Sequence, residues 1–306
     1  MNDVTENQYL SFDIGGTAIK WGLLKEDGTI VKKDSFPTGG WGRETLVRQL
    51  EETIEQFKSE INGISVCLPG FINPDGFIEY GGAIKGFNQF HFRKHFEEKF
   101  GLPVSVENDV NCVAMAEKWQ GNASDLSDFF CMTVGTGIGG ALVINDQLYR
   151  GHSFQAGECG FMITAGLHAD LPEHDSLSKI ASTYGLREKY AANKKLKLED
   201  VSGEDVFAAY EQNDPIAIKA VQRFYESIAI GIFNITSVIN PQKVLIGGGI
   251  TGRPSFIDEL RTHLDYVDMV FNVEVDICHF KNDAGLIGAL AHYFTIHPLE
   301  SEKRTV

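Results

Sequence analysis

Three glycine-rich turns are the segments of this sequence best suited to chemistry, because each follows a run that is typical of a buried β-strand. They cover residues 15–17, 135–140 and 247–249. A glycine-rich turn lets backbone N–H groups approach an anion closely, and such turns often hold phosphate. One turn alone would be interpreted as an ordinary hairpin. Three of them together favour a ligand site at the carboxyl ends of the strands.

An amide and a carboxylate, Asn108 and Asp109, stand where a predicted strand passes into a predicted helix. From the residues alone we favour a helix N-cap, since Asn and Asp often fill that position. The other interpretation is catalytic, because a carboxylate can orient a hydroxyl group and accept its proton. The residues by themselves leave this second interpretation open.

The apolar pattern predicts the elements that must position these residues. Apolar runs predict strands, and Leu46, Leu50, Ile54 and Phe57 form one stripe of a helix over 44–60. Further helices are predicted at 91–101 (closed by Gly101), 109–119, 203–238 (interrupted at Pro215) and 282–294. The strands are predicted at 9–14, 18–24, 29–33, 63–72, 103–108 and 241–250.

The segment 129–151 repeats the pattern of 10–31. Each consists of a strand, a glycine-rich turn, a second strand and then a DG or ND turn. This pattern indicates an internal duplication with copies about 120 residues apart. A chain of 306 residues has room for one large domain or two of ordinary size.

Composition excludes several classes of protein. A net charge of −15 argues against a surface for nucleic acid or anionic membrane. The five cysteines are widely spaced and form no CxxC, which favours reduced core thiols in a cytosolic protein. The polar start MNDVTENQ lacks the features of a signal peptide, and there is no apolar run of about 18 residues, so we expect no membrane span.

Two common nucleotide motifs are also excluded. GTGIGG at 135–140 formally matches GxGxxG, but a dinucleotide site needs a helix next and the chain continues with the β-rich segment ALVI. There is no Walker A sequence.

The motifs taken together resemble those of the sugar kinase and actin superfamily, and more narrowly the ROK family of sugar kinases. DIGGTAIK (13–20), LPG (68–70), ENDVNCVAMAE (107–117), VGTGIGG (134–140), AGECGF (156–161) and IGGGI (246–250) follow in the family's order over nearly the whole chain. The resemblance implies a duplicated actin-like/ribonuclease H-like α/β fold with an ATP cleft between two lobes. We expect residues 1–118 and a C-terminal helix (about 284–306) in the smaller lobe and 119–283 in the larger.

The resemblance also implies how the turns serve ATP. Asp13 would help place Mg²⁺ through water, while Lys20 would only flank the turn. The phosphates would be held by the first two turns and the adenosine by the third, through Gly15, Gly16 and Thr17, then Gly135, Thr136 and Gly137, then Gly247, Gly248 and Gly249.

On the acceptor side, the resemblance makes Asp109 the catalytic carboxylate, which would position a sugar hydroxyl in line with the γ-phosphate. Asn108, Gly70 and Glu158 would contact the sugar. Glu107 is interpreted as an ordinary polar residue at the end of a strand.

The sequence departs from the family after Glu158. Phe161 stands where the family has a histidine, and Ser178 where an ungapped alignment places a second glutamate. Residues 162–180 contain no cysteine, so we expect no structural zinc. The histidines and acids of this loop are expected to be solvated: His168, Asp170, Glu173, His174 and Asp175.

In the family, the lost histidine and glutamate lie near the C1 and C2 hydroxyls of the sugar. Their replacement by Phe161 and Ser178 relaxes the demand for a free C1 hydroxyl and adds an aromatic face. The sequence is similar to bacterial β-glucoside kinases, and we expect phosphorylation of the 6-hydroxyl of a β-glucoside such as cellobiose.

Three alternatives stay open or are weighed. The first is a hexose kinase acting on glucose, fructose, mannose or N-acetylmannosamine. The second, a sugar-responsive DNA-binding repressor, is disfavoured because the first strand begins near residue 9 and the charge is −15. The third, an inactive sugar sensor, is disfavoured because Asp109 and the glycine turns are intact. The family further implies a homodimer.

Overall fold

The structure is a computed structural model that describes residues 7–39, 42–168, 171–268 and 270–299. It divides into two compact units, each of which has its own sheet and core. Unit 1 comprises the described residues up to Ser124, the segment Gly151–Gln155 and the described residues from Asn282 on. Unit 2 comprises Asp125–Arg150 and Ala156–Lys281.

Unit 1 is built on a five-stranded sheet in the order β3-β2-β1-β4-β8. β1 pairs antiparallel with β2 and parallel with β4, and β8 pairs parallel with β4. The carboxyl ends of β1, β4 and β8 therefore lie at one edge of the sheet, which is where the first turn and Asn108 follow. The strands are β1 (Gln8–Ile14), β2 (Ala18–Lys25), β3 (Ile30–Pro37), β4 (Gly63–Leu68) and β8 (Val104–Asn108).

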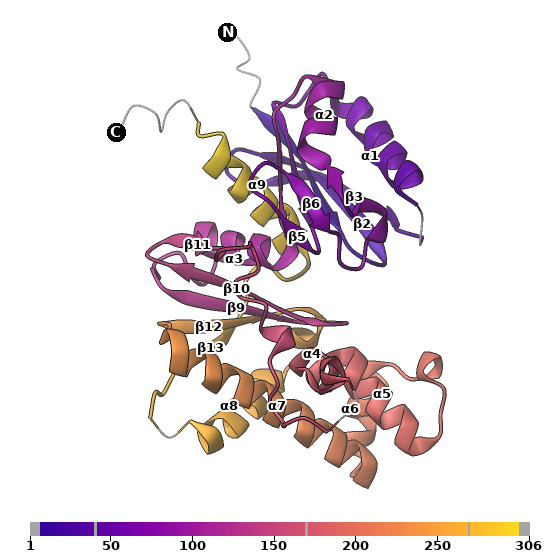
Figure 1. The fold of residues 1–306 in the computed structure, drawn as a ribbon, viewed down its shortest axis with the longest axis vertical. Helices are drawn as coiled ribbons and strands as arrows, with labels where there is room; N and C mark the ends of the chain where they lie inside the picture. The colour runs from indigo at the N-terminus through magenta and orange to yellow at the C-terminus, as the bar shows by residue number, and fades with distance from the viewer. Residues whose placement is uncertain (1–6, 40–41, 169–170, 269, 300–306) are drawn as a thin grey trace. The chain divides into compact units, whose positions relative to one another are not determined.

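Because side chains alternate along each strand, the two faces of this sheet pack against different helices (Figure 1). Phe12 and Val66 join the apolar cluster with α1 (Arg43–Phe57) and α2 (Phe92–Phe100). Cys67 points the other way and packs with α3 (Asp109–Gln120) and α9 (Ala284–Ile296). Asp13, which lies opposite Cys67 in the parallel register, shares that second face.

The expected helix stripe and C-cap of unit 1 are confirmed. Leu46, Leu50, Ile54 and Phe57 are buried along α1, and Gly101 ends α2 in the left-handed region at φ +67°. The sequence did not predict a small three-stranded sheet made of β5 (Phe71–Ile72), β6 (Phe77–Tyr80) and β7 (Phe90–His91).

Helices α3 and α9 approach each other closely because α9 carries small residues where they meet. A Cβ atom on Gly288 would lie 1.7 Å from the carbonyl oxygen of Cys112 in α3. The residues of α9 from Ala284 to Tyr293 are all buried. The small-residue face at 284–291 therefore serves helix packing within the chain.

Unit 2 repeats the topology of unit 1, which confirms the internal duplication. Its sheet has the order β11-β10-β9-β12-β13, with an antiparallel β9–β10–β11 meander and with β12 and β13 parallel to β9. The predicted ND turn has Asn145 and Asp146 at φ +51° and +64°. The strands are β9 (Phe129–Val134), β10 (Ile138–Ile144), β11 (Gln147–Tyr149), β12 (Lys243–Gly247) and β13 (Glu274–Ile277).

The helices of unit 2 share one apolar core with its sheet. The helical stretch predicted at 203–238 is two helices, because Asp214 caps a new helix that has Pro215 in its first turn. The helices are α4 (Leu177–Ala181), α5 (Thr183–Lys194), α6 (Gly203–Glu211), α7 (Pro215–Ile239) and α8 (Phe256–Val267). Among the described residues, no helix is long and apolar enough to cross a membrane.

Candidate active site

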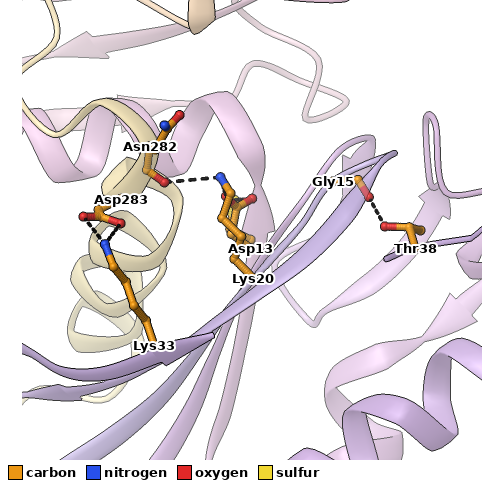
Figure 2. A network of polar contacts seen from close by, with 8 residues as sticks. Asp13, Gly15, Lys20, Lys33, Thr38, Asn282 and Asp283 are labelled. Atoms are coloured by element: carbon orange, nitrogen blue, oxygen red, sulfur yellow. Dashed lines mark hydrogen bonds and ion pairs between the residues drawn. The ribbon is translucent and has the colours of Figure 1, made fainter. Parts of the chain in front are cut away.

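The first glycine turn connects β1 to β2 and is held from β3. The Gly15 N–H donates to the Ala18 carbonyl oxygen at 2.9 Å. Thr38, just after β3, donates its hydroxyl to the Gly15 carbonyl at 2.6 Å (Figure 2) and its N–H to the Thr17 carbonyl at 3.0 Å. Gly16 and Thr17 are exposed at the tip. The turn is thus fixed from below while its tip is open to a ligand.

Asp13 is held at the end of β1 by contacts on several sides. The Lys20 ammonium lies 3.0 Å from its Oδ2 atom and also donates to the Asn282 carbonyl at 3.2 Å (Figure 2). The Cys67 thiol lies 3.7 Å from Oδ1. A Cβ on Gly285 of α9 would lie 2.7 Å from the Asp13 carboxyl carbon. Lys20, which was expected to flank the turn without contacting ATP, pairs with this carboxylate, and its expected lack of contact with ATP stays a prediction.

A second ion pair fastens the start of α9 to the same sheet. Lys33 of β3 donates to both carboxylate oxygens of Asp283 at 2.8 and 2.9 Å (Figure 2). Together with the Lys20–Asn282 contact, it fixes the loop that precedes Gly285 beside Asp13.

Asp109 is the first residue of α3 and is partly buried. Burial, together with the negative charge of Asp13, raises the pKa of Asp109 to about 6. The hydrogen bond from the Val110 N–H stabilises the ionised carboxylate and opposes this rise. The carboxylate therefore ionises near neutral pH, in the range that suits a general base.

Asn108 is the N-cap of α3, so the interpretation favoured by the residues alone is confirmed. Its Oδ1 accepts from the N–H groups of Val110 at 2.9 Å and Asn111 at 3.1 Å. Its Nδ2 donates to the Gly70 carbonyl at 3.1 Å. The amide has a second N–H, so capping leaves it able to donate to a ligand.

Gly70 is required by the backbone. Its φ is +118°, and a Cβ would lie 1.9 Å from the Tyr80 carbonyl oxygen. Any other residue would push β6 away from the loop that receives the Asn108 amide. A contact of Gly70 with sugar stays a prediction.

Glu107 is not the ordinary strand-end polar residue that we expected. It is only 4% exposed, and its Oε1 accepts from the Asn108 N–H at 2.7 Å and from Asn111 Nδ2 at 3.0 Å. Its Oε2 lies 3.5 Å from Nε2 of the buried His292 in α9. A buried carboxylate is tolerated where such partners compensate its desolvation. In the sequence, the signal for the contact between Glu107 and Asn111 was their four-residue spacing.

The second glycine turn, in unit 2, is tied to helices α4 and α5. The Gly135 N–H donates to the Gly137 carbonyl at 2.9 Å, and the Thr183 hydroxyl and N–H both donate to the Gly135 carbonyl, at 2.6 and 2.8 Å. The Ser178 hydroxyl accepts from the Ile138 N–H at 3.0 Å. Ser178, predicted only as a sugar contact, therefore also fixes the start of β10.

The third turn follows β12 and needs glycine at its centre. Gly248 has φ +95°, and a Cβ would lie 2.3 Å from the Val134 carbonyl oxygen at the end of β9. Gly249 has no other atom near its Cβ position and opens a short 3₁₀ helix.

A cavity of about 910 Å³ in unit 2 brings the second and third turns together. Gly135, Thr136 and Gly249 line it; Gly137, Gly247 and Gly248 do not. The sequence did not single out its other wall. There the Arg253 guanidinium lies 4.6 Å from the centre of the Phe207 ring. It also forms ion pairs with Glu211 and Glu259 at 2.6 and 2.8 Å. These residues belong to no motif recognised in the sequence.

Glu158 sits at the start of a 3₁₀ helix (Cys159–Phe161) that lies against β10, and it is partly buried. Its flanking glycines permit that contact. Gly157 has φ +90°, and a Cβ atom there would lie 2.7 Å from the Gly140 carbonyl oxygen. A Cβ atom on Gly160 would lie 2.0 Å from the Ile138 carbonyl oxygen. Phe161, at the end of this helix, is 67% exposed.

The loop after Phe161 is only partly solvated. Asp175 is buried and accepts from the His168 N–H at 2.6 Å, so the expectation that it is solvated was wrong. His168, Glu173 and His174 are exposed. Asp170 lies outside the described residues. The described part of the chain contains no group of three or more side chains able to hold a metal ion.

Comparison with known proteins identifies the family. The ROK family model matches residues 9–295. A β-glucoside kinase from Listeria monocytogenes is 38% identical over 284 residues, or 92% of this chain and 96% of the relative. A solved Listeria monocytogenes protein, suggested to be an N-acetylmannosamine kinase, has TM-score 0.91 at 37% identity over 95% of this chain and 99% of its own.

A ROK family protein from Streptococcus pneumoniae, solved in complex with sucrose, has TM-score 0.84 at 29% identity over 95% of this chain and 99% of its own. These matches confirm the expected duplicated actin-like/ribonuclease H-like fold and the sugar kinase class. The chain belongs to the ROK family.

Proposed function

We propose that this protein transfers the γ-phosphate of MgATP to the 6-hydroxyl of a β-glucoside such as cellobiose. The observation that carries the reaction class is Asp109, a partly buried carboxylate at the start of α3 with its pKa raised to about 6. A sugar hydroxyl is a poor nucleophile, and a carboxylate poised near neutral pH can orient it and accept its proton.

On the donor side, the two cavity-lining turns would hold the nucleotide. Gly135 and Thr136 would receive phosphate oxygens, and Gly249 would pass near the adenosine, since all three line the 910 Å³ cavity. The exposed tip at Gly16 and Thr17 suits phosphate as well, because Thr38 holds the carbonyls of Gly15 and Thr17 by hydrogen bonds. Gly15, Gly137, Gly247 and Gly248 would shape these turns.

The residues around Asp13 fit a magnesium ion bound through water. Carboxylate oxygens are the donors that Mg²⁺ prefers, and the negative charge of Asp13 already acts on Asp109. When bound, the ion would neutralise phosphate charge. Asp13 itself would be kept in place by Lys20 and Cys67.

The β-glucoside acceptor is supported by the named relatives and by the exposed aromatic face of Phe161 after Glu158. Asn108 and Glu158 would bind sugar hydroxyls, the first through its remaining amide N–H. A second candidate is a hexose kinase. It is favoured by the similar solved protein from Listeria monocytogenes, which is suggested to be an N-acetylmannosamine kinase.

The five buried free thiols fit a reducing, cytoplasmic setting for this reaction. The homodimer expected from the family stays a prediction, which the native mass in solution would test.

A coupled ADP-release assay with MgATP tests the proposal on cellobiose, gentiobiose, arbutin, glucose, fructose, mannose and N-acetylmannosamine. Turnover on the β-glucosides well above glucose is expected. Preference for a free hexose would replace the acceptor but keep the kinase. Bound ATP with no turnover on any sugar would favour the inactive sensor.

The pH profile of kcat/KM should follow Asp109. Its pKa is raised to about 6, and the carboxylate must be ionised to accept a proton. Activity should therefore be level above about pH 7 and fall about tenfold per pH unit well below pH 6. Initial rates from pH 4.5 to 8.5 measure this, with circular dichroism at each pH to show that the fold persists. A profile without an acidic limb near 6 contradicts the assignment.

A further inference from the structure

Unit 2 contains a second, smaller cavity of about 340 Å³ that shares Thr136 with the larger one. Thr136 belongs to the turn proposed to hold phosphate, so the two cavities adjoin at that turn. In-line phosphoryl transfer puts the acceptor on the side of the γ-phosphate away from the nucleoside. If the larger cavity takes the nucleoside, the smaller one lies on the acceptor side of the turn.

The lining of the smaller cavity has the chemistry that recognises a pyranose ring. Phe161 lines the cavity and offers it an aromatic face that is 67% exposed. Lys179 and Glu173 add charged groups that can bond hydroxyls, and the Ser178 hydroxyl lies between them in the sequence. Apolar walls with a few polar groups are typical of small-ligand sites.

The polar groups of this cavity are unequally available. Ser176 and Ser182 cap α4 and α5, and the Tyr184 hydroxyl donates to Glu188 at 3.1 Å. Ser178 accepts from the Ile138 N–H, which leaves its own proton to donate. The Lys179 ammonium lies 5.1 Å from the centre of the Tyr184 ring, and both residues line the cavity.

The cavity is also joined to the proposed sugar ligand. Glu158 begins the same 3₁₀ helix that ends at Phe161, and Gly160, between them, lines the cavity. A sugar held by Glu158 would therefore have this space beside it, rather than bulk solvent alone.

We infer that this cavity, walled by Phe161 and Lys179, is a subsite for the second ring of a disaccharide acceptor, the pyranose attached at C1 of the ring that is phosphorylated. The inference rests on the proposed function, which by itself requires only that C1 can be substituted. Phe161 stacks on the apolar face of the second ring, and Lys179 donates to its hydroxyls. The subsite sets preference among glycosides without touching the transferred phosphate.

The test compares Phe161→Ala and Lys179→Met with wild type on cellobiose and glucose. Both variants should raise KM for cellobiose, lowering kcat/KM about tenfold for loss of the aromatic wall, while glucose changes less than about twofold. Phe271→Ala, at an exposed phenylalanine outside this cavity, is the matched control. Ser178 is left intact because it also holds β10.

Equal effects on both sugars, or none on cellobiose, would overturn the subsite while leaving the kinase assignment in place. If wild type phosphorylates no β-glucoside, the proposed acceptor fails instead, and calorimetry then decides the subsite. Cellobiose binding that weakens in Phe161→Ala but not in Phe271→Ala supports it. Binding that is absent or unaffected overturns it.

Discussion

Replacing Asp109 by asparagine should lower kcat by about 10²- to 10⁴-fold, with little change in KM for ATP or sugar. The substitution keeps the shape of the side chain at the start of α3 but removes the carboxylate that we propose accepts the hydroxyl proton. Asn108 is proposed to help place the acceptor, and the substitution does not touch its contacts to Val110 and Asn111.

Thermal unfolding separates this loss from a folding defect. The pKa of Asp109 is raised in the folded state to about 6, so its stabilising contribution belongs to the protonated form and is lost as pH rises through 6. At pH 7.5 a neutral asparagine should therefore be at least as stable as the ionised aspartate. Asp125→Asn, at an exposed aspartate, is the matched control. Retention of near-normal kcat in Asp109→Asn would refute the catalytic role.

Replacing Gly288 by alanine should destabilise unit 1 by roughly 3 kcal/mol, at the upper end of the usual cost of overpacking. The new methyl would lie 1.7 Å from the Cys112 carbonyl oxygen, and backbone cannot swing aside as a flexible side chain can. Helix α9 would have to move away from α3, and Gly285, one turn earlier, sits against Asp13. Activity should fall together with stability, because Asp13 lies against α9 and Asp109 is the first residue of α3.

Chemical denaturation and differential scanning calorimetry measure the effect, and a melting temperature lower by about 5–10 °C is expected. Gly42→Ala is the matched control, since no atom lies within 4 Å of the Cβ position there and its φ is ordinary for any residue. If Gly288→Ala had the melting temperature of wild type, α3 and α9 would not be packed as described.

The local pattern of the sequence was enough to predict the elements that carry the candidate site. Period-two and continuous apolar runs marked β1, β4, β8, β9 and β12, and the stripe from Leu46 to Phe57 marked α1. The order of the motifs was enough for the family, which the match over residues 9–295 confirms. The strand predicted at 63–72 is two strands, β4 and β5, and the two-residue β7 was not predicted because so short a piece carries no period.

By itself, then, the sequence determined the repeated strand–turn–strand frame and the residues at its turns, because these depend on neighbours along the chain. Tertiary structure alone decided what those residues meet. Glu107 became a buried partner of His292, and Thr38 and Thr183 became the hydrogen-bond donors that hold the first two glycine turns. Each contact joins elements far apart in the sequence, where burial and packing, not local propensity, set the neighbours.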